Sequence, residues 1–269
     1  MNFEFDNDGF LTERRSLLET TIRRDSETLF SRAYQVNREC HRLLFASTPH
    51  NRDGREVLVV VSFIRALEHF QATVLLLGSG IIAPAKVALR ATLEAVFTAR
   101  AIARHDEALK EFITDDLLQR RKLIRKAQQH DHTNLEELRS AITPELLQGL
   151  DEQIKEVAAK SLTTERLSQL AGMHDWYTTV YAMLSKTTHS HARDLECYLR
   201  LDEGDKIQSL EYAPSIAEVP NLLLTGTHAI LLGAEAVAEV FQLAFDTKAE
   251  HLKFIEAEFA RMPAGPQRA

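Results

Sequence analysis

The stretch that decides the fold is RALEHFQATVLLLGSGIIAPAKVALRATLEAVFTARAI, residues 65–102. It holds two segments that are apolar on nearly all sides, joined by Gly78-Ser79-Gly80. A helix that is apolar all round lies at the centre of a bundle, and glycine commonly ends a helix. Pro84 stands where the first turn of a second helix tolerates it. We therefore expect helices over about 55–77 and 83–104, packed as an antiparallel hairpin in an all-α, multi-helix bundle.

The composition favours the same fold class. The 269 residues include only 10 Gly and 7 Pro, and aromatic residues make up 7%. So few turn-forming residues argue against an all-β fold, and against a doubly wound α/β fold with its Gly-rich loops. A share of 45% hydrophobic and 26% charged residues is ordinary for a globular chain and excludes a disordered one.

The rest of the chain is read as amphipathic helices around this hairpin. We expect one helical domain over 1–269, in which 106–172 forms a peripheral helical insertion and 263–269 a frayed tail. The further helices are expected over about 12–46, 107–129, the segment before Gly172, a segment from about Asp175, and 218–245 or beyond, with a small β-hairpin within 198–212.

Charge and cysteine content limit the classes of function. The formal net charge is -7, which argues against a generally basic nucleic-acid-binding surface but leaves room for a local basic patch. Cys40 and Cys197 lie far apart, with no second cysteine near either, so neither a zinc motif nor a redox pair is expected.

The sequence also predicts the compartment. Residues 1–10, MNFEFDNDGF, have neither the basic nor the apolar region of a signal peptide. The apolar stretch 57–77 is interrupted by Arg65, Glu68 and His69, which a membrane span would rarely carry. We therefore expect a cytoplasmic protein that does not bind membranes.

Three of the expected helices carry a polar stripe within an otherwise apolar segment. Residues i and i+4 lie on one helix face, so Arg90 and Glu94 share a stripe, which large apolar side chains enclose. Helical bundles build their ligand sites in the core, where such stripes meet. The stripes consist of Lys86, Arg90 and Glu94; of Ser62, Arg65, His69 and Thr73, with Glu68 to one side; and of Thr178, Tyr181, Ser185 and His189, accompanied by Lys186, His191 and Arg193.

As a hypothesis, Arg90, Glu94, Ser185 and His189 form a buried catalytic cluster. In it, His189 would act as general acid and base, Arg90 would hold an anion, and Glu94 would orient Arg90. The residues assigned to ligand binding are Arg65, Glu68, His69, Tyr181, Lys186, His191 and Arg193.

Each stripe taken alone also has an ordinary structural explanation. Arg90 and Glu94 fit a common salt bridge along one helix. His69 fits a core histidine whose hydrogen bonds are satisfied, and the third stripe fits hydrogen-bonded packing. Only the conjunction of the three stripes favours a functional site.

Other kinds of site are not expected. A ferritin-like di-metal centre needs two Glu-x-x-His pairs, and the sequence contains none. His130 and His132 lie two residues apart, as do His189 and His191, but no third ligand stands at a useful spacing. The sequence also lacks a nucleophile elbow and a Gly-rich phosphate loop. We therefore predict no metal and no cofactor.

An Arg and a His with four to six residues between them are the pattern of some all-helical ribonucleases. In such a pair the His can transfer a proton and the Arg can hold the phosphate. The pattern occurs at Arg100–His105, Arg125–His130 and Arg125–His132. A chain with this many Arg and His contains about that number by chance, so the pattern carries no weight of its own.

Residues 65–102, followed later by YAMLSKTTHSHARDLECYL at 181–199, resemble an uncharacterised bacterial all-helical domain family of unknown function. The resemblance rests on Arg90-x-x-x-Glu94 after a Gly-containing hairpin and on the Tyr181 stripe. It implies a multi-helix bundle and a polar cluster that links the two motif regions, without an established activity. A more distant similarity is to HEPN-type helical domains, a nucleotide-binding and ribonuclease group found in toxin and phage-defence systems. Their Arg…His motif has no counterpart before His189.

Two classes of function remain open. In the first, the polar cluster cleaves RNA or binds a small phosphate-bearing ligand. In the second, the protein is a non-catalytic interaction or scaffold protein whose cluster only fixes the helix register. In both, we expect a homo-oligomer formed through the long helices at 12–46 and 218–245.

Overall fold

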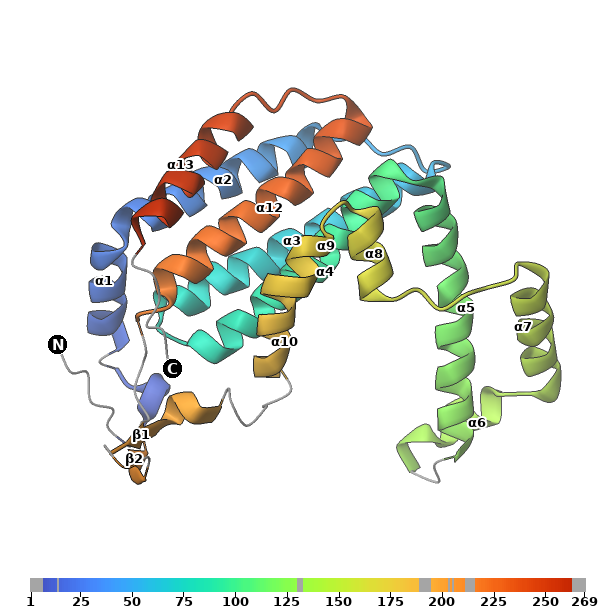
Figure 1. The fold of residues 1–269 in the computed structure, drawn as a ribbon. Coiled ribbons are helices and arrows are strands. Elements are labelled where there is room, and N and C mark those ends of the chain that lie inside the picture. The colour runs from blue at the N-terminus through green and yellow to red at the C-terminus, as the bar shows by residue number, and fades with distance from the viewer. Residues whose placement is uncertain are drawn as a thin grey trace.

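The computed structural model describes residues 7–13, 15–129, 133–188, 195–202, 204, 206–210 and 216–262. It is built almost wholly from helices (Figure 1), which confirms the all-α prediction. The main helices of the bundle are α1 (Arg15–Asp25), α2 (Glu27–Ala46), α3 (Gly54–Gly78), α4 (Ile82–Arg104), α12 (Val219–Phe241) and α13 (Lys248–Arg261).

Helices α3 and α4 form the predicted hairpin. Asp53 caps α3 by accepting hydrogen bonds from the backbone N–H groups of Arg55 and Glu56. At the other end Gly80 has a φ of 72°, which glycine adopts without the steric cost that a side chain would bring. The backbone N–H of Ile81 then donates to the carbonyl of Leu76 at 2.9 Å and closes the turn.

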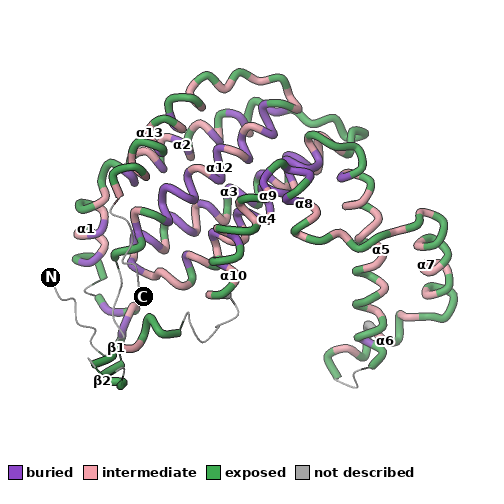
Figure 2. The backbone as a smooth tube through the Cα atoms, viewed as in Figure 1, coloured by how far each residue is buried: buried purple, intermediate pink, exposed green. Residues whose placement is uncertain are grey.

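Helix α12 lies between α2 on one side and the α3–α4 hairpin on the other (Figure 1). Most of its residues are buried, as its purple tube in Figure 2 shows. A Cβ atom added to Gly233 would lie 3.1 Å from Val96 Cγ2 and 3.3 Å from Phe63 Cδ2. The absence of a side chain at this position therefore lets α12 approach both helices of the hairpin.

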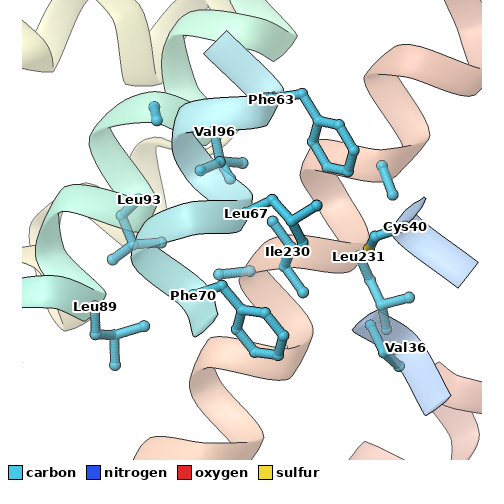
Figure 3. Close-up of a cluster of buried hydrophobic side chains, with 14 of the residues drawn as sticks. Val36, Cys40, Phe63, Leu67, Phe70, Leu89, Leu93, Val96, Ile230 and Leu231 are labelled. Atoms are coloured by element: carbon cyan, nitrogen blue, oxygen red, sulfur yellow. The ribbon is translucent and has the colours of Figure 1, made fainter. Parts of the chain in front are cut away.

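The core is one cluster of side chains, most of which come from α2, α3, α4 and α12 (Figure 3). Phe63 and Phe70 of α3 lie between the backbone of α12 and the neighbouring helices, and neither is exposed by more than 1%. Burial of such side chains stabilises a fold by about 1.5–3 kcal/mol each. The other labelled members are Val36, Cys40, Leu67, Leu89, Leu93, Val96, Ile230 and Leu231.

Two of the predicted helices are each divided in two, so their expected bounds were wrong. The segment 12–46 bends at Ser26, which leaves helical geometry at φ -125° and lets the apolar faces of α1 and α2 both reach the core. The segment 218–245 ends earlier, because Gln242 adopts the left-handed conformation at φ 50°. The chain then turns back into a separate helix, α13, whereas the sequence predicts one continuous helix here.

The segment after α4 leaves the bundle. Helices α5 (Asp106–Gln129), α6 (Glu136–Ala141) and α7 (Pro144–Glu156) form an arm that projects away from it, with a short turn, η2 (Thr133–Leu135), before α6 (Figure 1). Thr143 caps α7 through its hydroxyl, and Pro144 occupies the first turn. Helix α8 (Thr164–Leu170) returns to the bundle and packs on α4.

The remaining elements are short, and all except η1 lie between α8 and α12 in the chain. They are η1 (Gly9–Leu11), α9 (His174–Trp176), η3 (Tyr177–Tyr181), α10 (Ala182–Thr188), η4 (Glu196–Tyr198), β1 (Leu199–Leu201) and β2 (Ile207–Leu210). The two strands pair antiparallel, with Leu199 opposite Leu210, which confirms the small hairpin predicted within 198–212.

Helices α3 and α12 are long and apolar enough to cross a membrane, judged by length and composition alone. The most apolar window of α12 is 72% buried inside the bundle, as expected for a core helix, whereas that of α3 is only 44% buried. Helix α3 therefore keeps an uncovered apolar side.

Candidate functional site

The two motif regions of the sequence meet where α10 packs on α4. Helices α9 and α10 are joined without a break by η3, a turn of π-helix. The wider π-turn is rare and often occurs at functional sites. Within it the rings of Tyr177 and Tyr181 stack at 5.2 Å between centroids, and the ring of Phe97 on α4 lies 6.1 Å from that of Tyr181.

The hydroxyl of Tyr181 joins the two motif regions. Arg90 Nη2 donates to this oxygen at 2.8 Å, and the hydroxyl donates to Glu94 Oε1 at 2.7 Å. Arg90 and Glu94 also form an ion pair at 3.1 Å along one face of α4. The guanidinium lies over the ring of Tyr181, 5.0 Å from its centroid, as in a cation–π contact. These three residues form the Arg90–Tyr181–Glu94 cluster.

The charges of this cluster are largely satisfied within it. The side chains of Arg90 and Glu94 are 22% and 41% exposed. Burial, together with the hydrogen bond to Glu94, raises the pKa of Tyr181, so the phenol stays protonated and keeps donating at neutral pH. Of the side-chain nitrogen and oxygen atoms of this cluster, only Arg90 Nε is buried without a hydrogen-bond partner among the described residues. The carboxylate of Glu94 thus neutralises most of the positive charge of Arg90.

The other predicted site residues are not drawn into this cluster. Ser185 Oγ donates to the backbone carbonyl of Tyr181 at 2.9 Å, a bond within its own helix. Arg65 and Glu68 are exposed on α3, and His69 is half-buried there. The expected conjunction of three stripes does not form among the described residues, because Arg65 and Glu68 face outward, although Thr73 of the same stripe is buried. His189, His191 and Arg193 lie outside the described residues.

A groove runs along the other side of α10, between α10 and α12. It consists of two adjoining pockets of about 240 and 260 Å³, which share Met183, Leu184, Asn221 and Leu222 as lining. We call it the α10–α12 groove. Its size is in the range of small-ligand sites.

One end of the α10–α12 groove is cationic. Lys86 of α4 and Lys186 of α10 line it together with Glu218 at the start of α12. Lys86 Nζ is paired with Glu218 Oε2 at 2.8 Å, whereas Lys186 is exposed and forms no ion pair within the described ranges. The N-terminal end of a long helix such as α12 adds partial positive charge.

The other end of the groove is aromatic and apolar. Trp176 of α9 meets the ring of His228 edge-on, with 4.9 Å between the centroids. Phe259 of α13 and Leu89 of α4 complete this end. Burial lowers the pKa of His228, so its imidazole is neutral at physiological pH. The groove thus offers a cationic end and a flat apolar end to one ligand.

Sequence reasoning did not single out Trp176, Asn221 or His228. One signal could have found His228, since it is the one titratable side chain in the apolar run 222–234 of the sequence. Nothing local pointed to Trp176 or Asn221, because the groove joins segments that lie far apart in the chain.

Residues 56–207 match a family described as "Family of unknown function (DUF5677)". The chain belongs to this family. The predicted resemblance to a helical family of unknown function is thereby confirmed. No curated protein matches the chain, and no solved structure does.

The DUF5677 segment covers the chain from α3 to the start of β2 and ends before α12. It therefore includes the Arg90–Tyr181–Glu94 cluster and both lysines of the groove. The family description names no activity.

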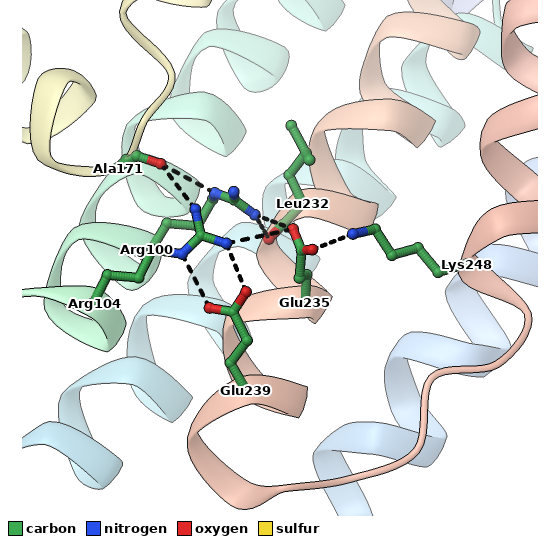
Figure 4. A network of polar contacts seen from close by, with 7 residues as sticks. All are labelled: Arg100, Arg104, Ala171, Leu232, Glu235, Glu239 and Lys248. Atoms are coloured by element: carbon green, nitrogen blue, oxygen red, sulfur yellow. Dashed lines mark hydrogen bonds and ion pairs between the residues drawn. The ribbon is translucent and has the colours of Figure 1, made fainter.

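Within the DUF5677 segment, the Arg100–His105 pair named from the sequence does not form a site. Arg100 is 6% exposed and donates to the Leu232 carbonyl at 2.9 Å and to the carboxylate of Glu235 (Figure 4). His105 lies exposed beyond the end of α4. The guanidinium of Arg100 is enclosed and is not available to hold a phosphate.

The contacts of Arg100 belong to a polar network that ties α12 to its neighbours (Figure 4). Arg104 donates to both carboxylate oxygens of Glu239. These contacts raise the pKa of Arg104 above its ordinary value. Lys248, the first residue of α13, pairs with Glu235. Ion pairs and hydrogen bonds at this depth fix the helix positions.

Among the described residues, no group of three His, Cys, Asp or Glu side chains could hold a metal ion.

Proposed function

We propose that this protein binds a small phosphate-bearing ligand in the α10–α12 groove. The observation that carries the proposal is that Lys86 and Lys186, from two different helices, line one pocket at the first turn of α12. Lysine ammonium groups and a helix N-terminus both favour a phosphate.

The two lysines have different roles in this proposal. Lys186 is the free cation and makes the principal contact with the phosphate. Lys86 is held by Glu218 and sets the position of the binding pocket, and it shares its charge with the ligand when the phosphate enters.

The apolar end of the groove receives the rest of the ligand. Trp176 offers a ring edge and face beside His228, and the remaining lining at that end is aliphatic or aromatic, apart from Asn221 and Thr225. Flat rings stack on aromatic side chains with about 1–3 kcal/mol per base in nucleic-acid complexes. A nucleotide therefore matches both ends of the groove.

The Arg90–Tyr181–Glu94 cluster acts in this proposal as a positioning device. It joins α10 to α4 and thereby holds Lys186 beside Lys86. Cleavage of RNA would require a proton-transfer group, for which the sequence offers His189 in the segment that follows α10. RNA therefore enters the test as a second probe.

The test uses the fact that Trp176 is the only tryptophan of the chain. Its fluorescence therefore reports on the groove alone. We expect titration with adenosine monophosphate to change this fluorescence in a saturable way, and inorganic phosphate to compete. Lys186→Ala removes one charge-assisted contact of about 1.5–3 kcal/mol, so affinity should fall tenfold or more.

The matched control is Lys155→Ala, which removes an exposed lysine on α7 of the arm and should leave the affinity unchanged. If adenosine monophosphate leaves the fluorescence unchanged, or if the two lysine variants bind it equally well, the proposal is wrong. A short single-stranded RNA, incubated with the wild type and with His189→Ala, tests the cleavage activity separately.

A further inference from the structure

The outer face of α3 is apolar and has no cover in the described part of the chain. Val61, Ile64 and Leu75 are 47%, 38% and 61% exposed, and they recur at helical spacing along one side of the helix. Single exposed apolar residues are normal, but a row of them on one helix marks an interaction surface. Together with Arg65, Glu68 and Ala72, they form what we call the α3 face.

The α3 face continues into an apolar groove between α2 and α3. This pocket has a volume of about 240 Å³, and Tyr34 of α2 and Phe70 and Leu75 of α3 are among its lining. It exists because α2 packs mainly on α12 and only loosely on α3. Gln71 donates to Asn37 Oδ1 at 2.9 Å across the pocket, which keeps the two helices at this separation. A row of side chains from another helix could enter here.

The α3 face carries two charges of opposite sign, and neither has a partner in the described part of the chain. Arg65 and Glu68 are both exposed, and neither forms a hydrogen bond or ion pair with its side chain in the described ranges. Other arginines of the hairpin behave differently, since Arg55 pairs with Asp106 and Arg90 with Glu94. The α3 face therefore holds one free cation and one free anion at its middle.

Most residues of the α3 face, together with Leu58 one turn before Val61, are arranged symmetrically about one point, and the exception is Ile64, whose counterpart is His69. Counted from the midpoint between positions 66 and 67, Arg65 is the counterpart of Glu68, Val61 of Ala72, and Leu58 of Leu75. When two copies of one helix pair antiparallel, counterparts lie level with each other across the twofold axis. An ion pair between Arg65 of one copy and Glu68 of the other would form twice, and apolar residues would meet on both sides of it.

We propose that a second copy of this chain packs on the α3 face, with the two α3 helices antiparallel. A parallel arrangement would place Arg65 level with Arg65 and Glu68 level with Glu68, which is repulsive. A lipid bilayer fits the face less well, because it would have to take up both charges at the centre of the apolar row. A partner of one charge sign would leave Arg65 or Glu68 unpaired. The inference is independent of the ligand proposal, since no residue of α3 lines the α10–α12 groove.

The test is a charge exchange followed by sedimentation equilibrium of the full chain. The wild type should be a dimer. Arg65→Glu places four carboxylates at the centre of the interface, and Glu68→Arg places four cations there, so each should weaken the dimer at least tenfold. The double variant R65E/E68R restores opposite charges and should restore the dimer to within a few-fold of the wild type.

A matched control and an apolar variant complete the experiment. Lys253→Glu makes the same change in charge at an exposed position on α13 and should leave the dimer intact. Val61→Glu should give a folded monomer, with the helical circular dichroism of the wild type.

Three results would overturn the inference. The first is a wild type that sediments as a monomer. The second is a double variant that stays as weak as the single ones. The third is a monomer that binds vesicles of anionic phospholipid through α3, shown by loss of that binding in Val61→Glu.

Discussion

The phenol oxygen of Tyr181 connects two parts of the chain that lie 91 residues apart. It accepts from Arg90 and donates to Glu94, so each group in the cluster has a partner of matching character. The pairing of Arg90 with Glu94 could be predicted from their spacing along one helix. From the sequence, Tyr181 could be assigned only to a polar stripe on its own helix. Its contact with Arg90 and Glu94 could not be predicted, because nothing in the sequence indicates which face of α4 lies against Tyr181.

Tyr181→Phe tests the stabilising effect of this oxygen. The ring and its stacking are kept, while Arg90 and Glu94 lose a partner in a partly buried place. We expect the free energy of unfolding, measured with urea, to fall by about 1–3 kcal/mol. Ser185→Ala is the control, since its hydroxyl bonds only to the carbonyl of its own helix, and it should change stability by less than about 0.5 kcal/mol. Equal effects of the two variants would contradict the role of Tyr181.

His228 and His251 make the stability depend on pH. Burial lowers the pKa of both below the ordinary value of 6.5, and Arg32 beside His251 lowers the pKa of His251 further. Below about pH 6.5 these two histidines therefore bind protons more readily in the unfolded chain than in the folded one. The free energy of unfolding falls as the pH drops through this range. Melting temperatures one pH unit above and below this value should show the loss.

His251→Asn separates the contribution of His251 from that of His228. Arg32 Nη1 lies 3.0 Å from His251 Nδ1, and an Asn side-chain oxygen can accept from the guanidinium in its place without titrating. The drop in melting temperature across the same pH range should become smaller. A drop as large as in the wild type would show that His251 does not contribute.

At the scale of the helix, sequence signals were reliable where glycine or proline stands at the boundary. The α3–α4 hairpin was predicted from Gly78 and Gly80, and its bounds agree with the structure. The break at Ser26 and the end of α12 at Gln242 were missed. Neither position carries a helix-breaking residue, and the chain bends there because the helices that follow must pack on the core.

Helix α12 can approach α3 and α4 only if position 233 stays small. Replacing glycine by alanine inside a helix usually stabilises it by about 1 kcal/mol. At Gly233 the new methyl group would press on Val96 and Phe63, which are completely buried and cannot move aside. We expect Gly233→Ala to lower the melting temperature despite its higher helix propensity.

The comparison for this variant is Gly149→Ala on α7. A Cβ atom there meets no atom within 4 Å, so only the gain in helix propensity should remain, and the melting temperature should not fall. If Gly233→Ala were as favourable as Gly149→Ala, the close packing of α12 would not limit this position.

At the scale of the whole molecule, the sequence indicated which residues were unusual but not which of them meet. The Arg90 and Tyr181 stripes come together, while the stripe with Arg65 and Glu68 faces outward. Periodicity gives the face of a residue relative to its own helix, whereas the direction of that face depends on long-range packing. The α10–α12 groove depends even more on long-range packing, because it exists only where α12 passes beside α10.

The position of α12 in the chain has a consequence for synthesis. A ribosome releases the α3–α4 hairpin long before α12, and at ordinary translation rates the gap lasts on the order of ten seconds. Local contacts allow the hairpin to form during that time, but Phe63 and Phe70 stay uncovered until α12 has emerged. We therefore expect the nascent chain to be prone to aggregation throughout this interval, and a message truncated before residue 219 to give an aggregating product rather than a smaller folded one.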